Sequence, residues 1–114
     1  MSQRHNCPCR EQCVLQSALD SIGGKWKLPV LCSLSANGAS RYNELLHSVQ
    51  GISNTMLSQT LRELERDGLI LRREYLEVPV RVEYDLSEQA QKLQPILRDL
   101  IAWKMGKEAH PGDP

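Results

Sequence analysis

The sequence predicts a mainly α-helical fold that carries one small β-hairpin. From residue 14 to residue 64, apolar residues recur at the three- and four-residue spacing of a buried helix face. Over residues 80–86 the spacing changes to every second residue, which is the period of a strand with one apolar face. Helical spacing returns after residue 87. We therefore expect four helices, a hairpin and a last helix, in that order.

Two helices are predicted before the first long turn. Residues 14–22 place their apolar side chains on one face, and the glycine pair at positions 23 and 24 ends this helix. A second apolar run begins at Trp26 and ends at the turn 36–38. Because a proline ring clashes with the preceding helical turn, Pro29 fits this second helix only if the helix begins near Lys27, or bends.

A pair of short helices comes next. Ser40 is suited to cap a helix over 41–49, because a serine oxygen accepts hydrogen bonds from the free N–H groups at a helix start. Ser53 is placed to cap the following helix, and Asp67 and Gly68 end it. The two helices are thus separated only by a tight turn.

A β-hairpin and a long helix complete the expected elements. Strands are predicted over 69–75 and 80–86, joined by a short loop. Ser87 is placed to cap the last helix, and Pro95 is expected to kink or split it.

Two short helices followed directly by a hairpin form the winged helix-turn-helix arrangement, in which the second helix enters the major groove of DNA. The outward face of that helix is expected to carry donors, with Leu57 on the opposite side. The first turn offers free N–H groups to phosphate. A solvated amphipathic helix is the alternative, and the hairpin that follows decides for DNA. The side chains expected on the outward face are Thr55, Ser58, Gln59, Arg62 and Arg66.

The predicted hairpin carries three arginines, Arg72, Arg73 and Arg81, which could contact phosphate or enter the minor groove. Arg81 is favoured because it lies close to the loop, whereas Arg73 shares a face with apolar neighbours. The alternative is ion pairing with the acids of the hairpin, Glu74, Glu83 and Asp85. The full set predicted to contact DNA is Arg41, Asn54, Thr55, Ser58, Gln59, Arg62, Arg72 and Arg81.

Three segments carry a family resemblance. The segment CVLQSALDSIGGKWKLPVLCSL at 13–34 resembles the opening of the HxlR family of MarR-like winged-helix regulators. SRYNELLHSVQGISNTMLSQTLRELERDGLILRREY looks like its helix-turn-helix, and VPVRVEYDLSEQAQKL is similar to its wing. The resemblance covers roughly residues 13–103. It implies a dimeric repressor or activator that binds double-stranded operator DNA and pairs through its first and last helices.

Cys13 falls where several members of that family carry a redox-sensing cysteine, so the resemblance implies a response to oxidants or electrophiles. The chemistry is compatible, because a helix start and the nearby Arg10 both favour a thiolate, which oxidants attack. Cys7 or Cys9 could then resolve the oxidised sulfur. The alternative is that Cys13 is simply a small buried apolar group.

The remaining cysteine readings are less specific. The run 7–13, with His5 before it, offers soft metal ligands, but C-x-C-x3-C is not a standard zinc spacing and no second ligand pair follows. We therefore predict no metal site. Cys32 lies between leucines and is expected to pack in the core.

Composition narrows the function class. The chain of 114 residues is 40% hydrophobic and 25% charged, which is typical of one globular domain. A formal net charge of zero argues against an indiscriminate nucleic-acid binder, so two copies are expected to be needed for useful affinity. No activated nucleophile, phosphate-binding loop or pair of carboxylates is recognisable in the sequence. We therefore expect neither an enzymatic activity nor a cofactor.

The expected organisation is a cysteine-bearing arm at 1–13, a winged helix-turn-helix at 14–105 and a flexible tail at 106–114. The sequence has no apolar run of membrane-spanning length and no signal-peptide core, so a cytoplasmic regulator is expected. Two alternatives stay open: a winged helix used only to bind proteins, and a metal-responsive switch built on the arm.

Overall fold

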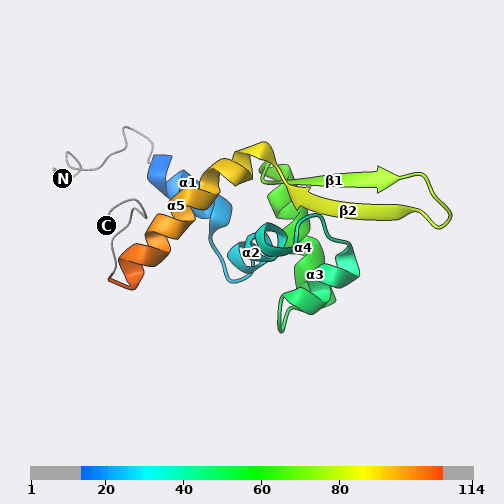
Figure 1. Ribbon diagram of the computed structural model, residues 1–114, viewed down its shortest axis with the longest axis horizontal. Coiled ribbons are helices and arrows are strands. Elements are labelled where there is room, and N and C mark those ends of the chain that lie inside the picture. The colour runs from blue at the N-terminus through cyan, green and yellow to red at the C-terminus, as the bar shows by residue number, and fades with distance from the viewer. Residues whose placement is uncertain (1–13, 107–114) are drawn as a thin grey trace.

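The computed structural model describes residues 14–106 and confirms a mainly helical fold with one antiparallel hairpin. The hairpin projects from one end of the helical body, and α1 and α5 lie together at the other (Figure 1). No helix within this range is both long and apolar enough to cross a membrane. The elements are α1 (Val14–Ile22), α2 (Lys27–Asn37), α3 (Tyr42–Ser48), α4 (Asn54–Arg66), β1 (Ile70–Tyr75), β2 (Arg81–Leu86) and α5 (Glu88–Lys104).

The core lies where α2, α3 and α4 meet the base of the hairpin. Leu34, Leu45, Leu57 and Leu64 are essentially inaccessible to solvent, and each comes from the apolar face that the sequence spacing indicates. Ile70 joins them from the first residue of β1. The core therefore fixes α4 against α2 and α3 and anchors the hairpin to the same unit.

Two of the three predicted serine caps are confirmed. Ser53 Oγ accepts a hydrogen bond from Met56 N at 3.1 Å, and Ser87 Oγ accepts one from Ala90 N at 3.1 Å. Both bonds join residues three apart, so the local sequence is enough to specify them.

The predicted cap at Ser40 is wrong. The N-cap of α3 is Arg41, whose backbone N–H donates to Glu44 Oε1 at 2.7 Å. Ser40 instead pairs its backbone with Tyr84 of β2, with N···O distances of 2.9 and 2.8 Å in the two directions. This bridge holds Ser40 in an extended segment, so the helix begins one residue later than expected.

The two prolines are accommodated differently. α2 begins at Lys27, which places Pro29 in the first turn, where a helix does not need its N–H. α5 runs without interruption from Glu88 to Lys104 with Pro95 inside it, so the helix is not split.

The hairpin pairs Ile70 with Leu86 at its base and Tyr75 with Arg81 at its outer end. Each strand begins one residue later than the alternation predicts. Leu86 is buried, whereas the loop side chains Leu76 and Val78 are almost fully exposed. The hairpin therefore packs against the core at its base, whereas the side chains of its loop are exposed to solvent.

Candidate nucleic-acid interface

α4 presents a polar face to solvent and an apolar face to the core. Leu57 and Leu61 are buried, whereas Thr55, Gln59 and Arg62 are exposed. The helix is strongly two-sided because its leucines are three and four residues apart. No ion pair formed by Arg62 is found within residues 14–106. Its guanidinium is therefore available to an outside partner.

The first turn of α4 is held by the hydroxyl of Tyr42, a residue that is absent from the predicted site. Tyr42 Oη lies 2.9 Å from the carbonyl oxygen of Asn54, 3.0 Å from Asn54 Oδ1 and 3.2 Å from Ser58 Oγ. Because Tyr42 belongs to α3, these contacts tie the two helices together. Only the residue type could have indicated this role from the sequence, because the hydroxyl of a half-buried tyrosine usually has a hydrogen-bond partner.

One carboxylate, that of Glu63, lies beside the polar face of α4. Gln59 Nε2 donates to Glu63 Oε2 at 3.1 Å, and the other oxygen of Glu63 lies 3.8 Å from Lys27 Nζ of α2. Lys27 thus offsets part of the negative charge that Glu63 brings to this surface.

The base of the hairpin adds a second arginine beside α4. Ser58, Arg62 and Arg72 line one cleft of about 230 Å³, whose remaining wall comes from α3, α4 and β2. Arg72 Nη1 lies 2.9 Å from Glu74 Oε2. Hydrogen bonds to Tyr84 and to Glu74 raise the pKa of Arg72 above its ordinary value. The cleft therefore brings together three of the residues predicted to contact DNA.

Arg81 lies at the opposite end of the hairpin and is held on several sides. Its two terminal nitrogens lie 2.9 Å from Glu77 Oε2 and 2.9 Å from Glu83 Oε2. Its guanidinium carbon lies 4.0 Å from the centroid of the Tyr75 ring. Arg73 Nη1 likewise lies 3.7 Å from Asp85 Oδ2. These pairs match the alternative role of ion pairing within the hairpin, so Arg81 has fewer free donors than Arg62.

The structure corrects the interpretation of Cys32. It is exposed, because the buried positions of α2 are Val30, Leu31 and Leu34, and residue 32 falls outside that stripe. Cys13, together with Cys7 and Cys9, lies outside the described residues.

A second surface, at the end of the molecule away from the hairpin, is apolar. No residue of α1 is buried, and Leu15 and Leu19 are about half exposed, at 50% and 47%. α5 adds Ile96, Leu100 and Trp103, of which Trp103 is 72% exposed. α1 and α5 lie side by side (Figure 1) and line a shared cleft that includes Ile22 and Ile96. Apolar area of this kind normally marks an association surface.

Comparison with known proteins agrees with this geometry. A family model described as HxlR-like helix-turn-helix matches residues 21–110. An HTH-type transcriptional regulator of Methanothermobacter thermautotrophicus is 47% identical over 91 residues, which cover 80% of this chain and 69% of the relative. The regulator YtcD of Bacillus subtilis is 47% identical over 89 residues, covering 78% and 70%.

Two solved structures extend the likeness to three dimensions. The crystal structure of YtcD matches with a TM-score of 0.78 at 43% identity, covering 83% of this chain and 96% of that one. The redox regulator HypR in its oxidised form matches with a TM-score of 0.70 at 37% identity, covering 84% and 98%.

Proposed function

Because the chain belongs to the HxlR-like helix-turn-helix family, we propose that it binds operator DNA as a homodimer and responds to oxidants or electrophiles through Cys13. The family consists of DNA-binding transcriptional regulators, so the chain is a regulator with a helix-turn-helix and not an enzyme.

The proposed reading surface is the outward face of α4. The observation that carries it is the exposed guanidinium of Arg62, which has no ion-pair partner among residues 14–106. Arg62 contacts a base edge or phosphate, while Thr55 and Gln59 offer further donors on the same face. Asn54 and Ser58 are positioned at the start of that face by Tyr42. Reading and positioning thus come from one rigid helix pair.

Flanking contacts are assigned to the start of α3 and to the hairpin. Arg41 is exposed at the N-cap of α3, and Arg72 shares the cleft with Arg62, so both are proposed phosphate contacts. Arg81 would have to exchange its carboxylate partners to reach a phosphate. Its proposed part is to stiffen the hairpin on which Arg72 is carried.

The apolar surface of α1 and α5 is the proposed homodimer contact. A second copy that covered the exposed part of each leucine on this surface would contribute on the order of 1–2 kcal/mol per side chain to the free energy of association. A two-fold pair sets two α4 helices at a fixed separation, which predicts a near-palindromic operator. Two copies also double the number of cations that reach DNA, which a chain of zero net charge needs.

Cys13 is the proposed sensor. Support comes from its position in the family motif and from solved relatives described as redox regulators, of which HypR is 37% identical to this chain. A Cys13 thiolate attacks a peroxide oxygen, the O–O bond breaks, and the products are a sulfenic acid and water or an alcohol. With a quinone it forms a C–S bond and gives a hydroquinone thioether. Position 13 directly precedes α1, a proposed dimer helix. With Cys13→Ser, an operator complex should persist in a gel-shift assay after treatment with a quinone. Release by the variant as complete as that of the unchanged protein would contradict the assignment.

The reading surface is tested with a duplex selected from randomised DNA. Arg62→Ala should weaken binding by roughly 1–3 kcal/mol in fluorescence anisotropy. Lys25→Ala, which removes an exposed cation from the loop between α1 and α2 instead, is the matched control and should bind as the unchanged protein does. Equal affinities for the Arg62 variant and the control would contradict the role of α4. A protein-binding module would show no salt-dependent DNA affinity at all.

A further inference from the structure

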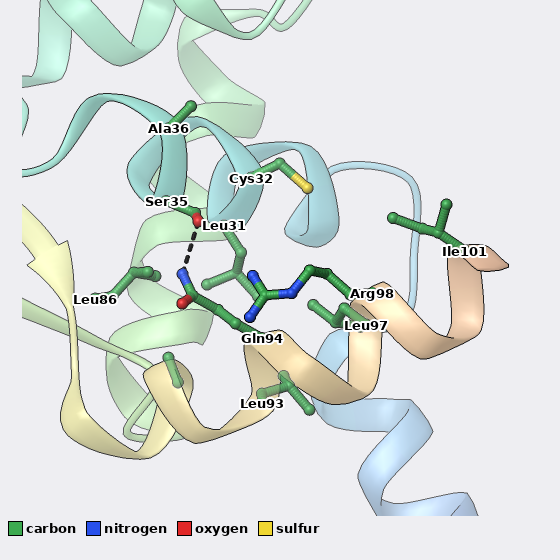
Figure 2. Close-up of a pocket in the computed structure, with 11 residues that line it drawn as sticks. Leu31, Cys32, Ser35, Ala36, Leu86, Leu93, Gln94, Leu97, Arg98 and Ile101 are labelled. Carbon is green, nitrogen blue, oxygen red and sulfur yellow. Dashed lines mark hydrogen bonds between the residues drawn. The ribbon is translucent and has the colours of Figure 1, made fainter. Parts of the chain in front are cut away.

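A cavity of about 190 Å³ separates α2 from α5. Its walls are mainly apolar, with Leu31 from α2, Leu86 from the end of β2, and Ala90, Leu93 and Leu97 from α5. Figure 2 shows Leu31 of α2 facing Leu93 and Leu97 of α5, and Cys32 and Ile101 also line the cavity. The cavity thus lies between α2, which belongs with α3 and α4 to the unit proposed to read DNA (the DNA-reading unit), and α5, which is proposed to form part of the dimer contact.

Polar groups in this lining are few and are concentrated on one side. Gln94 Nε2 donates to Ser35 Oγ at 2.6 Å, which links α5 to α2 across the cavity. The guanidinium of Arg98 turns from α5 toward Leu31 and Gln94 (Figure 2). No ion pair of Arg98 is found among the residues that the structure describes. A solvent-exposed cation that has no ion-pair partner among residues 14–106 therefore lies at the edge of a mainly apolar cavity.

The cavity and the proposed dimer surface use neighbouring faces of α5, which share Leu93. Leu93, Leu97 and Ile101 are four residues apart and form the stripe that faces α2. Ile96 and Leu100 form a separate stripe, and Ile96 faces α1. A second copy seated on α1 and on that stripe would leave the cavity accessible.

We propose that this cavity binds a small, mainly apolar carboxylate whose anionic group pairs with Arg98. A dry apolar cavity of about 150 Å³ is enough to bind benzene, so the larger volume here suits an aromatic ring with a carboxylate. Arginine presents two parallel N–H donors that match the two oxygens of such a group. Apolar walls with a few convergent polar groups are the usual composition of small-molecule sites.

Occupancy would bear on DNA binding, and this consequence rests on the proposed function. α2 packs against α3 and α4, whereas α5 carries the proposed dimer surface. A ligand between α2 and α5 sets the angle between the reading unit and the dimer helix, and so the separation of the two α4 helices.

Benzoate is the probe, and the full chain without DNA is the sample. Isothermal calorimetry should show saturable binding, and amide signals of the cavity residues should shift in 1H–15N NMR. Arg98→Gln should weaken benzoate binding about tenfold, because a charge-assisted hydrogen bond is lost, and should leave the weak binding of neutral benzyl alcohol unchanged. Lys92→Gln, which removes a cation from the same helix outside the cavity, should bind benzoate as the unchanged protein does.

Ala36→Leu gives an independent check, because Ala36 is exposed and lines the cavity, so a larger side chain fills it without disturbing the core. It too should reduce benzoate binding. Absence of saturable binding, or equal binding by the Arg98 variant and the Lys92 control, would overturn the proposal. Cavity shifts that follow protein concentration and ignore benzoate would assign the cavity to a second copy and overturn it as well. DNA binding without ligand is measured separately, so failure here leaves the reading surface of α4 standing.

Discussion

The two ends of this molecule treat their apolar side chains in opposite ways. Around α4, Leu45 and Leu57 are completely buried, whereas at the other end Val14 of α1 is 69% exposed and Trp103 of α5 is 72% exposed. The difference teaches that α2, α3 and α4, the unit proposed to read DNA, bury their apolar core within one chain, while α1 and α5 leave apolar side chains exposed among residues 14–106, as association surfaces do. Substitutions around α4 should therefore change the stability of the single chain and its affinity for DNA, whereas substitutions on α1 should change its association.

The largest effect is expected in the reading unit. Leu57→Ala should lower the free energy of unfolding by about 2–5 kcal/mol, because it leaves a cavity at a site that cannot collapse freely. Urea denaturation followed by circular dichroism measures it. Leu15→Ala on α1 is the matched comparison in dilute protein, where its loss should be far smaller. Equal losses would contradict the contrast between the two ends.

The next effect belongs to the apolar end. Leu19→Glu should shift sedimentation from dimer toward monomer by roughly tenfold or more in the dissociation constant, because a carboxylate would be buried in an apolar contact. Since Leu19 is about half exposed, at 47%, the fold of the single chain should persist. An unchanged sedimentation coefficient with intact circular dichroism would remove α1 from the proposed interface.

The smallest effect tests the link within the reading unit. Tyr42→Phe removes only the hydroxyl that contacts Asn54 and Ser58, so operator affinity should fall by about 0.5–1.5 kcal/mol. Fluorescence anisotropy with the same selected duplex provides the number, and circular dichroism confirms that the helices remain. Affinity equal to that of the unchanged protein would show that the hydroxyl does not position the face of α4.

The sequence predicted most of the local structure and less of what depends on distant contacts. The caps at Ser53 and Ser87 and the apolar face with Leu57 follow from residues within one or two helical turns, so they were readable. Ser40 was misassigned because its partner, Tyr84, lies far along the chain on the hairpin. A local pattern could not reveal that bridge.

The candidate site shows the same division. The polar face that includes Arg62 followed from helical spacing alone. Pairing of Arg81 with Glu83 is one of the two roles that the sequence leaves open. The pair with Glu77 is not among the predicted ones, because it depends on how the loop returns to the strand. The apolar neighbours of Cys32 predict a core position, but a shift of one position along a helix turns a side chain away from the buried stripe, and Cys32 is exposed.

The stoichiometry of the DNA complex tests the central claim most directly. Sedimentation of the selected duplex with increasing protein should give a complex of two chains per operator. Its affinity should fall steeply with added salt, and a duplex that contains one half-site should bind much more weakly. A complex with a single chain that binds one half-site as tightly as the whole operator would contradict the homodimer proposed to read DNA through α4.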